Sequence, residues 1–268
     1  MSAVPAAGTP AIEFIGVDKR FPARGTSGEV LAATNVTFAI QPGEVVSIIG
    51  PSGCGKSTLL NMGSGLARPS AGTVKVGGHE VSGPNRHVAF MLQKDLLMPW
   101  RTIAENVEFG LELRGVKKAD RKATSERLLD QCHLTGFGGH YPHQLSGGMR
   151  QRAAMARTLA VDPQVLLMDE PFSALDAQTK MILQQDLART VQKHGKTVLF
   201  ITHDLVEAVA LSDRILVMSE RPGTIIEQIP VDIPGRDNPM QRRKHERVGA
   251  YVGQLMDLLK LDANTEVH

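Results

Sequence analysis

The sequence predicts an α/β fold built on a parallel sheet. From Val161 onward, short apolar runs alternate with helical segments, which is typical of parallel strands covered by helices. An apolar run at 45–49 leads directly into a glycine-rich turn and a predicted helix. The chain before that turn consists of short β-like runs separated by glycine and proline. We therefore expect a parallel core preceded by a smaller, strand-rich part.

The individual elements follow the spacing of the apolar residues. Strands are predicted at 11–17, 30–40, 44–49, 73–76, 87–92, 165–168, 197–201 and 214–218. Helices are predicted at 55–64, 148–160, 177–194 and 204–211, with a helical pattern between 103 and 134. Gly77-Gly78 is typical of a hairpin turn. Because a glycine disfavours a helix interior by ~1 kcal/mol relative to alanine, Gly63 and Gly65 predict an early end to the first helix.

The two ends of the chain differ from this core. Residues 1–10 are rich in alanine, proline and glycine and predict a disordered tail rather than a signal peptide. Residues 231–268 form a C-terminal extension, in which a basic cluster at 242–247 precedes apolar residues at 248–259. We predict one terminal amphipathic helix within 237–261. The basic cluster is interpreted as the solvated face of this helix, and the apolar residues as the stripe by which the helix docks on the rest of the protein. A nucleic-acid or lipid site is the alternative.

Composition excludes several classes of protein. The chain has 268 residues, 42% of them hydrophobic, and a net charge of +2, so global disorder and a globally basic nucleic-acid binder are excluded. Cys54 and Cys132 are the two cysteines, and they match neither a zinc site nor a disulfide framework. A reducing compartment, and hence the cytoplasm, is the simplest interpretation. The apolar runs are shorter than the ~20 residues that cross a bilayer.

A phosphate-binding motif follows the 45–49 strand. The segment satisfies G-x-x-x-x-G-K-S and comprises Gly50, Pro51, Ser52, Gly53, Cys54, Gly55, Lys56, Ser57 and Thr58. Its glycines allow backbone N–H groups to surround phosphate oxygens, and the following helix adds its positive N-terminal dipole. Lys56 supplies a charge and Ser57 a hydroxyl for Mg²⁺. An ordinary glycine-rich turn is the alternative, but the coincidence of strand, motif and helix favours nucleotide binding.

Two acidic residues end the apolar strand at 165–168. Asp169 is suited to orienting Mg²⁺ through a bound water, and the adjacent Glu170 to polarising an attacking water as a general base. The alternative is that the two acids only cap the strand or pair with nearby cations.

A second anion site is indicated at the start of the 148–160 helix. Ser146 can cap this helix, while Gly147 and Gly148 leave backbone donors open. Considered alone, an ordinary capped helix would explain this turn equally well.

Taken together, these motifs resemble the ATPase subunit of ABC transporters over residues 12–229. The phosphate motif resembles the family's Walker A, and residues 165–170 its Walker B. The family's LSGGQ signature is resembled by Leu145, Ser146, Gly147, Gly148 and Met149, in which Met149 replaces the glutamine. The resemblance implies a P-loop, RecA-like parallel-sheet core with an antiparallel β subdomain and a helical ABC-specific subdomain at about 95–155. The ATPase domain would span 11–230.

The resemblance also assigns single residues. Gln93 looks like the Q-loop residue that meets Mg²⁺, and Asp176 like the D-loop aspartate. His203 looks like the switch histidine and Phe21 like the aromatic residue that stacks on adenine. The alternatives are a solvent-facing glutamine, an ordinary N-cap, a hydrogen-bonded strand-end histidine and a core phenylalanine. The implied magnesium ligands are Ser57, Gln93 and Asp169.

The family's assembly implies partners. The cofactors would be ATP and Mg²⁺, with ATP bound at Lys56 of one subunit and completed by Ser146 to Gly148 of a second copy. Transmembrane permease subunits would dock nearby, a solute-binding protein would act indirectly, and the chain would lie peripherally on the cytoplasmic side of the inner membrane. The apolar segment 96–100, which includes Trp100, is interpreted as part of the permease groove or, alternatively, as ordinary subdomain packing.

Two questions stay open at this stage. Residues 96–101, 207–208, 213–214 and 221–223 look like the nitrate, sulfonate and taurine importer branch, but none of them would contact the solute. The rival function is a soluble ABC-type switch acting on nucleic acid or ribosomes, and a small-molecule kinase with this phosphate motif is a third. One phosphate motif, one signature and balanced charge favour transport, with no nucleic-acid partner expected.

Overall fold

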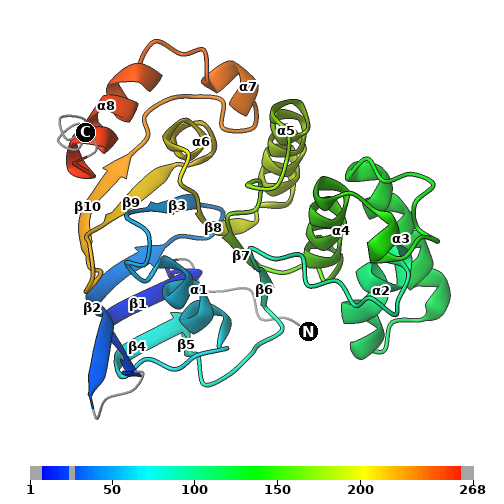
Figure 1. Ribbon diagram of the computed structural model, residues 1–268, viewed down its shortest axis with the longest axis horizontal. Helices are drawn as coiled ribbons and strands as arrows, with labels where there is room; N and C mark the ends of the chain where they lie inside the picture. Colours follow the sequence, from blue (N-terminus) through cyan, green and yellow to red (C-terminus); the bar gives the residue numbers. More distant parts are fainter. Residues whose placement is uncertain (1–7, 24–27, 261–268) are drawn as a thin grey trace.

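The computed structural model describes residues 8–23 and 28–260, and its main sheet is the predicted parallel one (Figure 1). Strand order is β10-β9-β3-β8-β7-β6, with every neighbouring pair parallel except β10 and β9. The strands are β3 (Val45–Ile49), β6 (Val88–Met91), β7 (Val165–Asp169), β8 (Thr197–Ile201), β9 (Arg214–Met218) and β10 (Ile225–Pro230). The α/β prediction is confirmed. Strands β3, β7 and β8 are buried along their whole length, which explains why their sequences are almost entirely apolar.

A second, antiparallel sheet has the order β2-β1-β4-β5. Its strands are β1 (Ile12–Pro22), β2 (Glu29–Ile40), β4 (Ala71–Val76) and β5 (His79–Glu80). Phe14 and Phe38 stack on each other from β1 and β2, with ring centroids 4.6 Å apart. The hydrophobic cluster around them also contains residues of α1 (Lys56–Ser64) and of the parallel sheet. The antiparallel sheet is therefore fixed to the core through the helix that follows the phosphate motif.

The remaining helices lie in two groups (Figure 1). Helices α2 (Ile103–Leu113), α3 (Lys118–Gln131) and α4 (Gly147–Ala160) form a cluster to one side of both sheets. Helices α5 (Ala177–His194) and α6 (Leu205–Leu211) belong to the core, and the chain ends with α7 (Pro239–Arg242) and α8 (Val248–Leu258). The early end predicted for the first helix is found at Ser64. Within the described ranges, no helix combines the length and the hydropathy that crossing a membrane requires.

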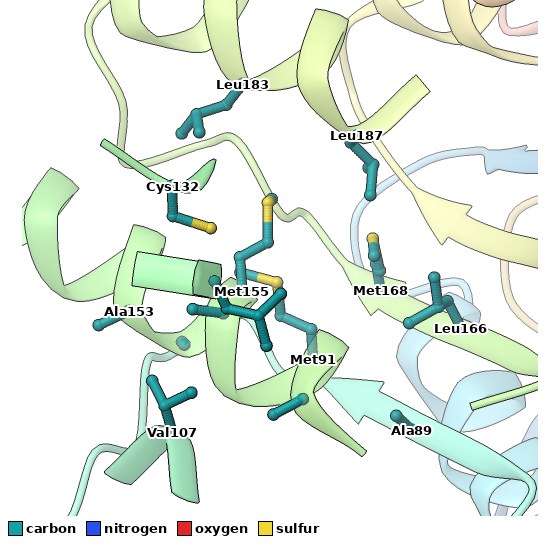
Figure 2. Packing of buried hydrophobic residues seen from close by; sticks show 14 of the residues in the cluster. Ala89, Met91, Val107, Cys132, Ala153, Met155, Leu166, Met168, Leu183 and Leu187 are labelled. Carbon is teal, nitrogen blue, oxygen red and sulfur yellow. The ribbon is translucent and has the colours of Figure 1, made fainter. Parts of the chain in front are cut away.

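The helical cluster shares a hydrophobic core with the parallel sheet. Figure 2 shows Met155 of α4 beside Met91 and Cys132, and the same core includes Met168 of β7 and Leu183 of α5. Burial raises the pKa of the Cys132 thiol to about 12, so this cysteine is a packing residue rather than a nucleophile. Methionine side chains adapt to irregular gaps, and here they fill the junction between the two parts of the molecule.

The C-terminal prediction was partly wrong. The expected single helix is two helices, because residues 243–247 form turns in which the His245 ring accepts the Arg247 N–H and competes with helical hydrogen bonding. Arg242, expected on a solvated face, is buried. Strand β10 was not predicted at all. Most of the predicted N-terminal tail (1–7) and the last eight residues (261–268) lie outside the described residues.

Candidate nucleotide site

A cavity of about 840 Å³ collects most of the residues predicted to bind nucleotide. It lies at the carboxyl end of the parallel strands, where ligands of open α/β sheets bind. Its lining is drawn from six separate parts of the chain: Phe21, Pro22, Val30, Ala32, Ser52, Gly53, Gly55, Lys56, Ser57, Thr58, Gln93, Asp169, Glu170, Ile201 and Arg221.

The backbone conformation of the glycine-rich turn requires glycine at position 55. Gly55, the N-cap of α1, has φ +105°, and a Cβ at this position would lie 2.9 Å from the carbonyl oxygen of Ala32. Lys56 Nζ donates hydrogen bonds of 2.7 Å to the carbonyls of Gly50 and Pro51. These contacts hold the lysine across the turn. The backbone N–H groups at the start of α1 have no acceptor within the helix, so an anion can satisfy them.

Cys54 lies beneath the turn rather than in the cavity. Its side chain is 1% exposed, and its sulfur is 3.8 Å from Lys56 Nζ. A Cβ on Gly50 would lie 3.1 Å from the same sulfur, so the space around Cys54 is filled. Cys54 is therefore a small packing residue of the turn.

The acids at the end of β7 have different environments. Asp169 is buried, and this burial raises the pKa of its carboxyl, although a hydrogen bond with Ser57 opposes the shift. Glu170 has φ +47°, a left-handed conformation that costs a non-glycine residue about 1–3 kcal/mol. Its N–H donates to the Ile201 carbonyl at 3.1 Å, and the Ser173 hydroxyl donates to its carbonyl at 3.0 Å. The backbone strain at Glu170 is therefore held in place by β8 and the turn after β7.

Two side chains from neighbouring strands converge on the Glu170 carboxylate. Gln93, two residues after β6, donates Nε2 to Glu170 Oε2 at 3.2 Å. His203, two residues after β8, places Nδ1 3.5 Å from the same oxygen. Strands β6, β7 and β8 are parallel neighbours, so their carboxyl ends meet at one edge of the sheet. This edge is suited to holding a water molecule beside a carboxylate base.

The donors present also fit a magnesium ion that a bound nucleotide would share. Mg²⁺ prefers oxygen ligands and commonly uses one or two protein groups plus phosphates and water. The Ser57 hydroxyl and the Asp169 carboxylate are hydrogen-bonded neighbours, and Gln93 lines the same cavity. In the described part of the chain, no group of three or more His, Cys, Asp or Glu side chains could hold a metal by itself. Such a site therefore depends on the nucleotide.

Phe21 is not a core residue. It is 42% exposed, lies near the end of β1, and lines the cavity opposite the glycine-rich turn. Lys19 Nζ lies 5.1 Å from its ring centroid. The structure excludes the core alternative for Phe21 and leaves an aromatic face available beside the cavity.

The signature residues and Asp176 do not line this cavity. Ser146 caps α4 by accepting the Met149 N–H at 3.3 Å, and Leu145 is buried while Ser146 and Gly147 are exposed. Asp176 caps α5: it accepts the Thr179 N–H at 3.0 Å, and this bond holds the pKa of its carboxyl below the ordinary value. Figure 1 shows α4 well separated from α1. The two turns that were predicted to bind anions are therefore separate within one chain.

The sequence interpretation missed the wall formed by Pro22, Val30, Ala32 and Arg221. Arg221 comes from the turn between β9 and β10, which is 168 residues from the glycine-rich turn it contacts. Its Nε and Nη2 atoms donate to the Gly53 carbonyl at 3.1 and 2.8 Å. No local motif signals such a contact, although Arg221-Pro222-Gly223 already stood out as a branch-like segment.

Comparison with known proteins decides the family. A family profile described as ABC transporter matches residues 33–173. The chain is 44% identical over 222 residues to the nitrate import ATP-binding protein NrtD of Synechocystis, covering 83% of this chain and 84% of that one. The chain belongs to the ABC transporter family. It is also 45% identical over 205 residues to the taurine import ATP-binding protein TauB of Yersinia pestis, covering 76% and 80% of the two chains.

A solved ABC cassette has the same fold. The dimeric structure of the ATP-binding cassette MJ0796 in a post-hydrolysis state with ADP and Pi superposes with a TM-score of 0.76 at 32% identity. The superposition covers 82% of this chain and 98% of that one. The P-loop ABC fold is thereby confirmed, and the protein is an ATP-binding transport ATPase that hydrolyses ATP.

Proposed function

We propose that this chain is the ATP-binding subunit of an ABC importer and works as a head-to-tail pair. The observation that carries the proposal is the separation of its two anion-binding features. The cavity holds the phosphate turn and Glu170, whereas the exposed signature turn at Ser146 lies on the α4 side of the molecule. A second copy can bring its signature turn onto ATP held at Lys56.

In the proposed reaction, each group of the cavity has one task. The turn and Lys56 bind the phosphates, and Phe21 stacks on adenine. Ser57, Gln93 and Asp169 would hold Mg²⁺, with Asp169 acting through water, and the ion would supply neutralisation of phosphate charge. Glu170 accepts a proton from the attacking water, and Gln93 and His203 orient the carboxylate and the γ-phosphate. Thr58, Pro51 and Ser52 complete the phosphate turn.

ATP then acts as a switch because only the triphosphate spans both copies. The γ-phosphate contacts the signature residues Leu145 to Met149 of the second copy, and Asp176 lies at the same junction. ADP lacks this phosphate and loses the differential contact that favours the closed pair. Hydrolysis therefore opens the pair and returns the chains to their starting state.

The variant Glu170→Gln tests the proposal directly. It keeps the shape of the side chain but cannot take a proton, so ATP binds and turnover stops. We expect the variant to form a stable dimer with Mg-ATP and to stay monomeric with ADP, as measured by size-exclusion chromatography with light scattering.

A matched control is Glu170→Gln combined with Lys56→Ala, which weakens ATP binding and is expected to remain monomeric. A Glu170→Gln protein that binds ATP yet stays monomeric at every concentration would refute the head-to-tail pair. Wild-type turnover by the variant would remove Glu170 from the role of base.

The transported solute is proposed to be a small anion such as nitrate, a sulfonate or taurine. The support is the similarity to the nitrate and taurine import proteins over most of the chain. The partners would be transmembrane permease subunits and, indirectly, a solute-binding protein, with the chain peripheral on the cytoplasmic face of the inner membrane. Co-purification with a polytopic membrane protein is expected, whereas ATPase stimulation by nucleic acid or ribosomes would instead support the soluble switch.

A further inference from the structure

The turn between β9 and β10 braces the phosphate turn from outside. Arg221 donates two hydrogen bonds to one acceptor, the carbonyl oxygen of Gly53, at 3.1 and 2.8 Å. Charge-assisted hydrogen bonds of this kind are stronger than neutral ones. The guanidinium also lines the nucleotide cavity, so its charge lies beside the space that the phosphates would fill.

The backbone of the same turn is packed against the phosphate turn. A Cβ on Gly223 would lie 2.0 Å from the Cys54 carbonyl oxygen, so the two backbones are in close contact. The Gly223 N–H donates to Ala32 and its carbonyl accepts from Thr34, both at 3.0 Å. Residues 221–223 are therefore fixed to β2 and to the phosphate turn together, which gives Arg221 a rigid base.

The hydrogen bonds from Arg221 fix the orientation of the Gly53–Cys54 peptide group. Gly53 has φ +73°, a conformation that glycine adopts readily, and the Cys54 N–H of the Gly53–Cys54 peptide makes only a long hydrogen bond, 3.4 Å, to the Pro51 carbonyl, so the turn by itself holds this peptide weakly. If this peptide rotated, its carbonyl oxygen could face the cavity and repel a phosphate. With the oxygen held by Arg221, the N–H of the same peptide keeps its orientation, and a donor on the carbonyl polarises that N–H.

We propose that Arg221 is a positioning residue for the nucleotide polyphosphate, acting through the Gly53 carbonyl. The inference rests on the nucleotide role of the phosphate turn. It adds that a residue of the β9–β10 turn sets the affinity of this chain for the phosphates, and leaves the chemistry at Glu170 unchanged.

Arg221→Ala is the central test. Because the substitution removes both donors from the Gly53 carbonyl, we expect the dissociation constants of fluorescent ATP and ADP analogues to rise about tenfold, which corresponds to about 1.4 kcal/mol. The turnover number at saturating ATP should stay within about twofold of wild type. The inhibition constant of inorganic tripolyphosphate, which has no base or ribose, should rise by the same factor as the dissociation constant of ATP.

Three further variants separate a specific role from a general one. Arg221→Lys keeps one donor and should recover part of the affinity, which a purely steric role would not require. Phe21→Ala should weaken ATP binding without changing the tripolyphosphate constant. Arg20→Ala, which removes an exposed arginine with only a 3.9 Å ion pair to Glu29, should change neither.

Thermal unfolding of each variant is measured first, so that loss of fold is not mistaken for loss of affinity. If wild type binds ATP while a folded Arg221→Ala binds both nucleotides normally, the inference is wrong. It is also wrong if kcat falls while affinity is unchanged. Failure of wild type to bind ATP would count against the nucleotide site itself, which is a separate outcome.

Discussion

Arg242 is 3% exposed, although it belongs to the basic cluster near the C-terminus. Its guanidinium donates to the carbonyls of Ala210, Ser212 and Val231 at 3.3, 2.8 and 3.2 Å. Ala210 and Ser212 lie at the C-terminal end of α6, where a positive charge meets the negative end of the helix dipole. Burial lowers the pKa of Arg242, and the nearby Asp213 opposes that shift.

We expect Arg242→Met to lower the free energy of unfolding by about 2–3 kcal/mol, because it leaves buried carbonyls without donors. Methionine preserves most of the apolar stem, so the loss reports on the hydrogen bonds. Urea denaturation monitored by circular dichroism measures the change. Lys244→Met, at an exposed position in the same cluster, is the control and should differ from wild type by less than about 0.5 kcal/mol.

At this scale, the sequence predicted residues that lie in one short motif. Lys56 and Ser57 follow the glycine-rich turn directly, and Glu170 follows a continuous apolar strand. Arg221 and Arg242 were missed as functional or structural residues because their partners are far along the chain. A sequence does not distinguish a buried arginine from an exposed one, because burial depends on backbone carbonyls that only the fold brings close to the guanidinium.

Helices α5 and α6 are joined by a polar network beside the proposed catalytic edge. Lys180, in the first turns of α5, contacts Asp204 at 2.9 Å and Glu207 at 2.7 Å. Glu207 is 2% exposed and also accepts a hydrogen bond from Gln184 at 2.8 Å. Asp204 directly follows His203, and Lys180 lies four residues after Asp176. The network therefore fixes the start of one helix against the start of the other.

We expect Lys180→Met to destabilise the protein by about 3 kcal/mol at pH 7, because it leaves the buried Glu207 carboxylate without its cation. Burial is the largest single influence on Asp204 and would raise its pKa, but the hydrogen bonds from Lys180 and the Glu207 N–H, together with the charges of Lys180 and Arg243, outweigh it and hold this pKa below its ordinary value. The stability from Asp204 is therefore present above the ordinary pKa of about 3.9 and is lost as the pH falls further. Denaturation at pH 7 and pH 3 should show the difference shrinking in acid.

Lys122→Met is the matched control for this substitution. Lys122 forms a 3.8 Å ion pair with Glu126, and both side chains are largely exposed. Exposed pairs contribute little, so we expect a change below about 0.5 kcal/mol at either pH. An equal loss in both variants would show that the α5–α6 network has no special role in stability.

Elements with strong periodicity or end signals were predicted, and those without them were not. Helix α4 begins at its Ser146 cap, and β7 and β8 each contain four consecutive apolar residues. Strand β10 has one buried residue among six and gains its place only by pairing with β9. The C-terminal segment has helical periodicity, but the His245 side chain interrupts its hydrogen bonding. Tertiary pairing and side-chain competition decided these two cases.

At the scale of the whole molecule, the partly exposed apolar segment 96–100 lies between the proposed catalytic edge at Glu170 and the cluster of helices α2, α3 and α4. Trp100 is 73% exposed and Leu96 is also exposed, which argues against ordinary packing for these two side chains. Arg157 of α4 donates to the carbonyls of Leu96 and Asp95 at 2.7 and 2.6 Å. The segment is therefore firmly held by α4 while presenting apolar surface.

We expect Trp100→Ala to leave basal ATP hydrolysis unchanged, because the indole does not line the nucleotide cavity. Stimulation of hydrolysis by a reconstituted membrane partner should be lost if this surface receives the permease. Phosphate release in proteoliposomes measures both quantities, with Leu113→Ala, another exposed apolar side chain, as the control. Full stimulation of the Trp100→Ala protein would place the docking surface elsewhere.

The separation of the signature turn from the phosphate turn has a genetic consequence in the proposed pair. Each reaction centre would combine parts from both copies, so a chain defective at Ser146 would spoil the centre that its neighbour supplies with Lys56. In a cell making normal and altered chains in equal amounts, mixed assemblies would outnumber fully normal ones. An allele altering that serine would therefore also remove one reaction centre from each intact chain that it pairs with.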